Sequence, residues 1–210
     1  TDAPRAMAEE ACRRGVPFIH FSTDYVFDGS RTEPYIETDL PSPKGCYART
    51  KLDGEKAVEA VGGIHFIFRT SWVYSMRGDN FVTKVIKWAQ QKKELHVVTD
   101  QIACPTWSRT LAELTAQALS QIIHMGSPWT LERRGVYHLA SADYVSRYDL
   151  ACYVVRRLGL PVSVLPALSR EFPSPVERPV FSALSSSLFS QTFRIRVPGW
   201  SEMLDLALEV

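Results

Sequence analysis

Two short apolar runs separated by a helical segment constrain the fold of this chain more than any other feature. Residues 16–21 and 64–69 are each apolar enough to form a buried strand. Between them, residues 45–61 have helical character and end at Gly62-Gly63. A strand, a crossover helix and a second strand make a β-α-β unit, so we expect a parallel sheet with helices packed on it.

The other periodic segments extend this α/β pattern along the chain. Residues 95–98 and 136–139 predict further strands, and the predicted helices cover residues 1–14, 80–92, 108–124 and 146–159, with one more after Pro198. Ser146 and Asp149 resemble a capping box at the start of the 146–159 helix. Residues 160–198 are richer in Pro and Ser, and no further regular element is expected there.

The composition is that of an ordinary globular protein and excludes several classes of partner. The chain has 210 residues, of which 45% are hydrophobic and 22% charged, and its formal net charge is +1. This balance gives no overall field for nucleic acid or a membrane surface. There is neither a signal-peptide pattern nor an apolar run near the ~20 residues that span a bilayer, so we expect a cytoplasmic protein without a nucleic-acid or membrane partner.

The cysteines and histidines give no pattern of a metal site or a disulfide framework. Cys12, Cys46, Cys104 and Cys152 lie far apart, with no CxxC pair and no histidine at ligand spacing. The five histidines have no partner at metal or triad spacing either. We therefore expect reduced thiols and no bound metal.

Tyr47 and Lys51 are the strongest candidates for chemistry, because residues four apart lie on the same face of a helix. A free phenol is a poor acid at neutral pH. A cation ~4 Å away favours its ionised form by about 4 kcal/mol at an effective dielectric of ~20, which would suit it to proton donation. The same spacing also occurs by chance on many helices, so context must decide between the two interpretations.

Ser22, Thr23 and Asp24 follow the first strand run and could belong to the same site. Ligands of open α/β sheets bind at the carboxyl ends of parallel strands, and a hydroxyl at such an end can polarise a carbonyl group. The alternative is a turn that simply ends the strand. Convergence with Tyr47 in space would distinguish the two.

An ordered set of motifs resembles the extended short-chain dehydrogenase/reductases, and among them the dTDP-4-dehydrorhamnose reductases. The resemblance covers nearly the whole chain and rests on Ser22-Thr23-Asp24-Tyr25-Val26-Phe27-Asp28-Gly29, Pro34-Tyr35, Glu37, Asp39, Pro43, Tyr47, Lys51, Gly54-Glu55, Arg69-Thr70-Ser71-Trp72-Val73-Tyr74, Asn80-Phe81, Asp100-Gln101, Pro105-Thr106, Arg178-Pro179, Ser182 and Leu184. It implies a Rossmann-type, doubly wound parallel sheet with a small C-terminal substrate-binding lobe. Ala48 stands where the family usually has glycine, and alanine suits a helix.

The resemblance also implies a reaction. Thr23, Tyr47 and Lys51 would form the catalytic triad, with Tyr47 as proton donor, Lys51 on the nicotinamide ribose and Thr23 orienting the sugar carbonyl. Thr70 and Ser71 would join Tyr47 and Lys51 in contacting the cofactor. The reaction implied is reduction of dTDP-4-dehydro-L-rhamnose at C4 by hydride from NADPH, with NADH as the alternative donor.

Substrate contacts are expected from both ends of the chain. The resemblance places Trp72 against the sugar ring, although a tryptophan at a strand end is as often a core residue. Arg178 could pair with the diphosphate, although a surface arginine is the commoner case. The full set of expected substrate contacts is Ser22, Thr23, Asp24, Tyr25, Trp72, Gln101, Thr106 and Arg178.

The family's glycine-rich phosphate loop is absent from the sequence. No GxGxxG or GxxGxxG follows a strand, and we expect about 60 to 90 residues to precede the first helix in a complete enzyme. Residues 1–75 are then the remainder of the dinucleotide-binding domain, lacking its first strands. Residues 76–210 form mainly the substrate lobe, with residues of about 94–135 returning to the main sheet. A sheet lacking strands exposes an apolar edge, so we expect an unstable or self-associating chain, with a homodimer as one form.

Two other functions fit parts of the same pattern. One is a sister nucleotide-sugar epimerase or reductase, which shares the Tyr-x-x-x-Lys motif but fits the 69–74 and 178–179 segments less well. The other is a non-catalytic regulatory subunit that resembles the beta subunit of methionine adenosyltransferase. The presence of Thr23, Tyr47 and Lys51 argues against the second.

Overall fold

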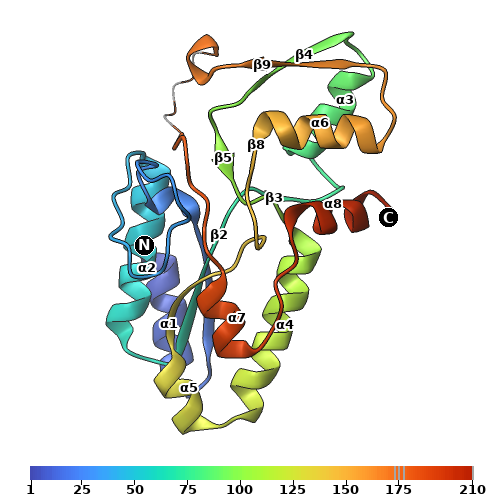
Figure 1. Ribbon diagram of the computed structural model, residues 1–210. Coiled ribbons are helices and arrows are strands. Elements are labelled where there is room, and N and C mark those ends of the chain that lie inside the picture. Colours follow the sequence, from blue (N-terminus) through green and yellow to red (C-terminus); the bar gives the residue numbers. More distant parts are fainter. Residues whose placement is uncertain (173, 175, 177, 210) are drawn as a thin grey trace.

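A three-stranded parallel sheet forms the centre of the lower body of the molecule (Figure 1). The computed structural model describes residues 1–172, 174, 176 and 178–209. The strands are β1 (Phe18–Thr23), β2 (His65–Thr70) and β7 (Gly135–His138), in the order β1-β2-β7. Phe18 pairs with His65 and Phe66 with Gly135, and both pairings are parallel. The α/β architecture with a parallel sheet is confirmed.

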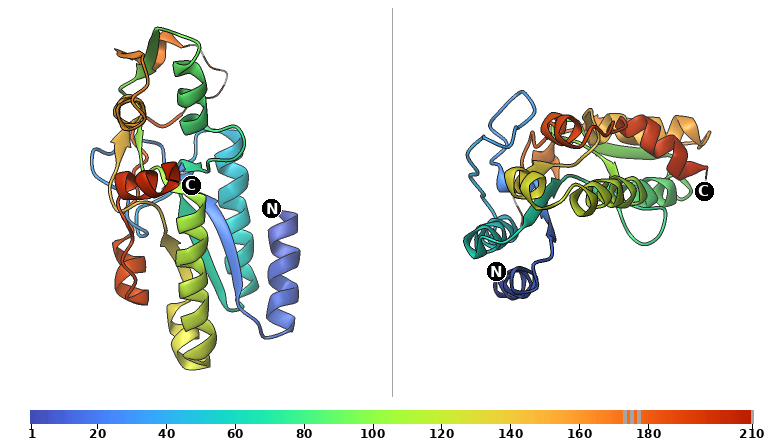
Figure 2. Two further views of the ribbon diagram at one scale, coloured as in Figure 1. Left: turned by 90° about the vertical axis from the view of Figure 1, so that its right-hand side faces the viewer. Right: turned by 90° about the horizontal axis from the view of Figure 1, so that it is seen from below.

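Helices cover both faces of this sheet. The two views in Figure 2 place α1 (Asp2–Arg13) and α2 (Cys46–Val61) on one side, and α4 (Ser108–His124) and α7 (Ser187–Phe193) on the other. The short helix α5 (Ser127–Arg133) follows α4 at the lower end. This is the layering expected of helices that flank a parallel sheet.

The alternation of side chains along β2 explains the two layers. Ile67 points toward the cluster that holds Ala8 of α1 and Val58 of α2. Phe66 and Phe68 point the other way, into the main core with α4 and α7. All three β2 side chains are fully buried, as expected of a strand with both faces covered.

A smaller lobe lies above the sheet (Figure 1). It contains α3 (Phe81–Ala89), α6 (Arg147–Arg157) and a parallel pair of strands, β4 (Glu94–Val98) and β9 (Ser163–Ala167). Asn80 caps α3 by a complete capping box with Thr83. The same hydrophobic core continues from the main sheet into this lobe.

Short strands and turns connect the body to the lobe. Pairs are formed by β3 (Val73–Tyr74) with β6 (Thr106–Trp107), in parallel, and by β5 (Ile102–Ala103) with β8 (Val145–Ser146), antiparallel. The helix α8 (Trp200–Leu208) contacts β6. Two 3₁₀ turns, η1 (Asp24–Val26) and η2 (Ser169–Glu171), complete the described elements.

The expected elements are present, with some shifts. The first strand run is longer than predicted at its carboxyl end, so Ser22 and Thr23 belong to β1. Within residues 94–135, β4 pairs with β9 in the lobe, α4 lies along the main sheet, and Gly135 begins β7. The sequence patterns did not predict β9, α5 or α7.

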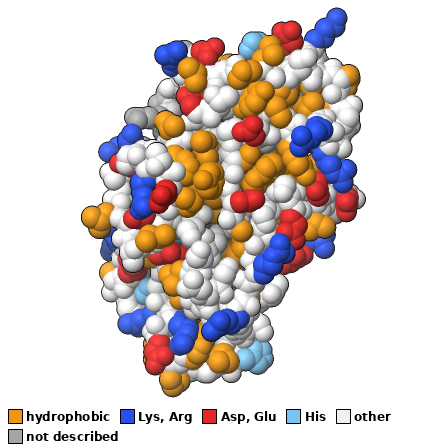
Figure 3. All heavy atoms as spheres, in the orientation of Figure 1, with side chains coloured by type: hydrophobic (Ala, Val, Ile, Leu, Met, Phe, Trp, Pro, Cys, Tyr) orange, Lys and Arg blue, Asp and Glu red, His pale blue; other side chains and the backbone are white. Residues whose placement is uncertain are grey.

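One face of the surface carries charges of both signs. Figure 3 shows Lys and Arg side chains interspersed with Asp and Glu over the face that it presents, with hydrophobic side chains between them. In the described part of the chain, no helix has the length and apolarity to cross a membrane. Among the same residues, no group of three or more His, Cys, Asp or Glu side chains could hold a metal ion.

Candidate active site

A large cavity opens between the carboxyl end of the main sheet and the upper lobe. Its volume is about 1540 Å³, which exceeds the ~300–1,000 Å³ typical of sites for drug-sized molecules and suits a longer ligand. Walls come from the first turn of α2, from α3 and β4, and from eight described residues near the C-terminal end: Ser169, Arg170, Phe172, Ser174, Val176, Arg178, Pro179 and Val180. Of the residues predicted from the sequence, Tyr25, Tyr47, Trp72, Gln101 and Arg178 line it.

The start of α2 brings Tyr47 into this cavity. Gly45 is the N-cap, so Tyr47 lies in the first helical turn, and its side chain is 58% exposed. Its ring meets the Tyr25 ring edge-on, with the centroids 6.4 Å apart. A phenol in this position is open to a ligand and is held on one side by an aromatic neighbour.

Lys51 lies one turn further along α2 and is bound to the end of β1. Its Nζ donates a hydrogen bond to the Phe21 carbonyl at 2.5 Å. Partial burial lowers the pKa of Lys51, against the opposing Glu55 carboxylate. No hydrogen bond joins Tyr47 to Lys51 or to Thr23 in the parts of the chain that the structure describes.

Thr23 is buried at the carboxyl end of β1, next to Asp24. Its hydroxyl donates to Asp24 Oδ1 at 3.1 Å and accepts from the Tyr25 amide at 3.3 Å. Asp24 Oδ2 accepts from Ser71 at 2.8 Å and from Ser182 at 2.6 Å. Asp24 therefore joins the ends of β1 and β2 to the C-terminal segment.

Burial makes Asp24 a weaker acid than an ordinary carboxyl group. Its side chain is 2% exposed, and burial raises its pKa to about 6, although the hydroxyls of Ser182, Ser71 and Thr23 oppose this rise. Its donors include the hydroxyls of Thr23, Ser71 and Ser182, so Asp24 connects three segments of the protein to one another. The structure does not place Asp24 or Ser71 in the cavity wall.

Two hydroxyls at the carboxyl ends of β1 and β2 have no hydrogen-bond partner among the described residues. They are Ser22 Oγ on β1 and Thr70 Oγ1 on β2, whose residues are near-neighbours in the sheet. Buried polar atoms of this kind are uncommon and call for a partner. Their position, at the edge where parallel sheets bind ligands, fits a cofactor with polar groups.

A buried ion pair fastens α2 to β2 behind the site. Arg69 Nη2 and Glu55 Oε2 are 2.7 Å apart, with a second contact of 3.1 Å from Nε to Oε1. Both side chains are almost fully buried, and the guanidinium also lies 5.3 Å from the centroid of the Phe27 ring. The pair fixes the part of α2 that follows Lys51.

Trp72 projects into the cavity from a strained backbone. Its φ is +40°, a conformation that costs a bulky residue on the order of 1–3 kcal/mol. The Arg147 guanidinium, from the start of α6, lies over its ring at 4.0 Å from the centroid. Arg147 Nε donates to Gln101 Oε1 at 2.9 Å, so three segments distant in sequence meet here.

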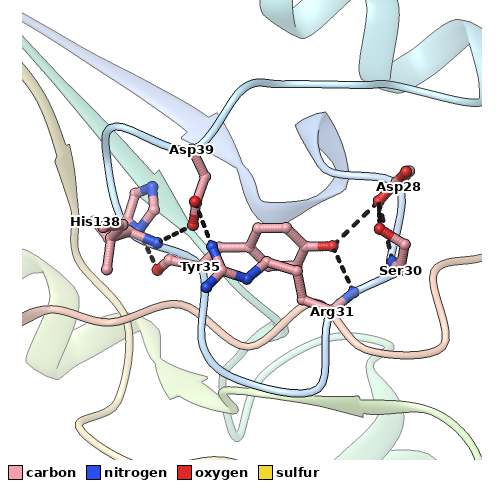
Figure 4. A network of polar contacts seen from close by, with 7 residues as sticks. Asp28, Ser30, Arg31, Tyr35, Asp39 and His138 are labelled. Carbon is pink, nitrogen blue, oxygen red and sulfur yellow. Dashed lines mark hydrogen bonds and ion pairs between the residues drawn. The ribbon is translucent and has the colours of Figure 1, made fainter.

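A loop behind the site is held by a polar network, shown in Figure 4. The Tyr35 hydroxyl donates to Asp28 at 3.2 Å, and Arg31 forms an ion pair with Asp39. His138 Nδ1 donates to the Tyr35 carbonyl at 3.1 Å. Burial, assisted by the neighbouring Arg69, lowers the pKa of His138 to about 3, so this histidine is neutral and ties the loop to β7.

The C-terminal segment that carries Arg178 crosses the same loop at Gly29. The φ of Gly29 is +81°, and a Cβ there would lie 2.8 Å from Pro179 Cβ. Only glycine permits this conformation together with this close approach. The packing brings the exposed Arg178 to the cavity wall.

The structure thus divides the predicted site residues into two groups. Tyr25, Tyr47, Trp72, Gln101 and Arg178 line the cavity, and the others lie beneath it or beside it. Thr106 is 1% exposed and bonds to the Cys104 carbonyl and the Ser141 amide, as a core residue does. Arg147 and the Glu55–Arg69 pair were missed, because their partners are distant in sequence and no local pattern marks them.

Sequence relatives identify the kind of enzyme that this arrangement resembles. The family model described as RmlD substrate binding domain matches residues 1–210. The dTDP-4-dehydrorhamnose reductase of Sinorhizobium fredii is 40% identical over 205 residues, covering 96% of this chain and 68% of the relative. The Escherichia coli K12 enzyme of the same name is 38% identical over 201 residues, covering 93% and 66% respectively. This chain spans about two thirds of the length of these relatives.

Solved structures agree with the sequence relatives. The dTDP-4-dehydrorhamnose reductase of Clostridium acetobutylicum superposes with a TM-score of 0.88 at 33% identity, covering 98% of this chain and 70% of that one. The Bacillus anthracis enzyme, solved in complex with NADP, gives a TM-score of 0.90 at 29% identity, covering 100% and 71%. The Rossmann-like fold is therefore confirmed, and this chain belongs to the RmlD substrate-binding family, the family of the dTDP-4-dehydrorhamnose reductases.

Proposed function

We propose that this chain carries the proton donor and the substrate-binding wall of an NADPH-dependent dTDP-4-dehydrorhamnose reductase. The observation that carries the proposal is the position of Tyr47. Its exposed phenol lies in the cavity at the carboxyl end of the parallel sheet, one turn from Lys51. Membership of a family whose named relatives are such reductases supports the same reaction.

In this mechanism the protein supplies orientation and a proton. NADPH, when bound, supplies the hydride that reduces the C4 keto group of dTDP-4-dehydro-L-rhamnose. Tyr47 donates the proton to the C4 oxygen, and Thr23 orients the carbonyl group. Lys51 lies at the same edge of the sheet, where its ammonium can donate hydrogen bonds to a ribose.

The residues at the strand ends fit the nicotinamide half of the cofactor. Thr70 and Ser22 carry hydroxyls that lack a partner in the described structure, and Lys51 Nζ donates a hydrogen bond to the Phe21 carbonyl of β1. We assign Tyr47, Lys51, Thr70 and Ser71 to the cofactor. We keep Ser22, Asp24 and Thr106 as candidates for the substrate side. Asp24 and Thr106, like Ser71, are buried and would act on a ligand through neighbouring groups, whereas the Ser22 hydroxyl could serve either ligand.

We propose further that the protein works in a reducing compartment, the cytoplasm. Cys12, Cys46, Cys104 and Cys152 are all free thiols, and Cys12 and Cys46 are exposed. Exposed thiols without a partner are typical of reducing conditions. The division into a cofactor part, residues 1–75, and a substrate part after it belongs to the same proposal.

The test is NADPH oxidation with dTDP-4-dehydro-L-rhamnose, with the sugar product identified by NMR. Tyr47→Phe should lower the rate by about 10²–10⁴-fold, because the general acid is lost. Tyr144→Phe is the matched control, since Tyr144 is also exposed and does not line the cavity. Unchanged turnover in Tyr47→Phe, or a product inverted but not reduced, would contradict the proposal.

A further inference from the structure

Three arginines line the cavity, namely Arg147, Arg170 and Arg178, and two of them, Arg147 and Arg178, act on the same phenol, that of Tyr25. Burial raises the pKa of Tyr25 and lowers the pKa of Arg147; both guanidiniums oppose the rise at Tyr25, and the Arg178 charge adds to the fall at Arg147. No ion pair to either arginine occurs within the described ranges of the chain. Asp24 is nearby, but its oxygens accept hydrogen bonds from three hydroxyls. Two cations left together in this way favour an anion between them.

Arg147 is held in place more firmly than a surface arginine. Its guanidinium lies between two aromatic rings, 4.0 Å from the Trp72 centroid and 4.8 Å from the Phe81 centroid. Such stacking over ring faces is favourable for a planar cation. The side chain is half-buried, so the charge is partly shielded from water.

Gln101 fixes the remaining orientation of the guanidinium. Its amide oxygen accepts from Arg147 Nε at 2.9 Å, and its amide nitrogen donates to Ser169 at 2.9 Å. Ser169 in turn donates to Asp100 at 2.8 Å. This chain of bonds engages Nε and leaves the outer nitrogens of the guanidinium beside Tyr25 at the cavity.

We propose that Arg147 is a substrate-binding residue that, with Arg178, binds the diphosphate of the nucleotide sugar. A diphosphate carries the negative charge that two neighbouring guanidiniums require, and guanidinium groups bind phosphate oxygens in a planar, bidentate manner. The Trp72 ring would then lie beside the point where the sugar joins the diphosphate. This inference rests on the proposed function for the identity of the ligand.

The test measures binding of dTDP, thymidine and inorganic pyrophosphate by titration calorimetry. Arg147→Met keeps an unbranched apolar side chain between the two rings but removes the charge. It should weaken binding of dTDP and of pyrophosphate by about ten- to a hundredfold and leave thymidine unchanged. Arg156→Met is the matched control, because Arg156 also lies on α6 over a ring, that of Tyr153, but outside the cavity.

The outcomes separate this inference from the proposed function. If wild-type protein binds dTDP and Arg147→Met binds it equally well, the role of Arg147 is wrong and the reductase proposal stands. If thymidine weakens as much as dTDP, Arg147 only supports the Trp72 wall, which also overturns the inference. If the wild type binds pyrophosphate but not dTDP, and Arg147→Met loses pyrophosphate binding, the anion site is supported and the proposal of a nucleotide-sugar substrate is contradicted. Binding of neither ligand by the wild type would contradict both.

Discussion

Asp24 shows how a single residue can serve the site without facing it. Its carboxylate gathers hydroxyls from Thr23, Ser71 and Ser182, so one buried group sets the distance between two strand ends and the C-terminal segment. Hydrogen bonds to a charged acceptor are stronger than those to a neutral one, but the charge itself is destabilised by burial. The balance between these effects depends on pH.

The pH dependence of stability should reveal this balance. Burial raises the pKa of Asp24 from 3.8 to about 6, so between these values the folded protein holds a proton that the unfolded chain has lost. The free energy of unfolding therefore falls as pH rises through this window, by about 3 kcal/mol in total. In Asp24→Asn this fall is absent, so from about pH 4 to pH 7 the variant should gain about 3 kcal/mol relative to wild type.

Urea unfolding at several pH values, followed by circular dichroism, measures the difference. His138 titrates in the opposite sense, since burial lowers its pKa to about 3, but it is present in both proteins and cancels in the comparison. Parallel stability curves for wild type and Asp24→Asn would show that Asp24 has an ordinary pKa in the folded protein.

At the scale of elements, the helix that carries Tyr47 and Lys51 depends on the buried pair of Glu55 and Arg69. Removing one partner leaves the other charge buried and unpaired, which typically costs about 3–5 kcal/mol. Glu55→Met and Arg69→Met should each destabilise the protein by this amount. The double variant should be more stable than either single variant, because no lone charge remains.

A double-mutant cycle of unfolding free energies checks this prediction. Additive losses in the double variant would mean that the 2.7 Å contact contributes no coupling. Lys84→Met is a suitable control, because Lys84 forms a largely exposed ion pair with Asp79 and should change stability by about 1 kcal/mol or less.

Elements with strong periodicity and clear caps were predictable from the sequence, and weakly patterned ones were not. α4 matches its predicted range of 108–124, and α2 differs by one residue. β9 was missed because Pro166 argues against a strand; it is tolerated since β9 pairs on one side only, with β4. α7 was missed because it is rich in serine, yet Phe189 and Phe193 hold it in the core.

The site was predictable to a similar and limited extent. Tyr47 and Lys51 share one helix, so their spacing could be read directly from the sequence. For Arg147 the sequence predicted only a position at the start of a helix. Its contacts with Trp72 and Gln101 depend on how α6 packs against the rest of the protein. Long-range packing of this kind has no local signature in one sequence.

At the scale of the whole molecule, the outer edge of the main sheet, formed by β1, is the site where we expect association with another chain. β1 pairs with β2 on one side, and no other described strand pairs with it. Its Phe21 side chain is 39% exposed, and the Phe21 carbonyl accepts a hydrogen bond from Lys51. An exposed apolar edge strand is a template for pairing with another chain, and charged side chains on the edge oppose such pairing.

We therefore expect the 210-residue chain to self-associate through β1, with an average mass by light scattering that rises with concentration. Phe21→Lys should reduce this association, because a charge at an edge disfavours strand pairing. The melting temperature of this variant should also be recorded, since Phe21 contacts the Phe68 ring and the substitution could destabilise the fold. Leu40→Lys removes an even more exposed apolar side chain, 89% exposed, away from the sheet, and should leave association unchanged. A monomeric wild type at all concentrations, or equal effects of the two substitutions, would show that the β1 edge is not the contact. Lys51, which is proposed to hold the cofactor, donates a hydrogen bond to the Phe21 carbonyl of this edge strand. If association occurs through β1, binding of a ligand to Lys51 should therefore change the average mass that light scattering reports.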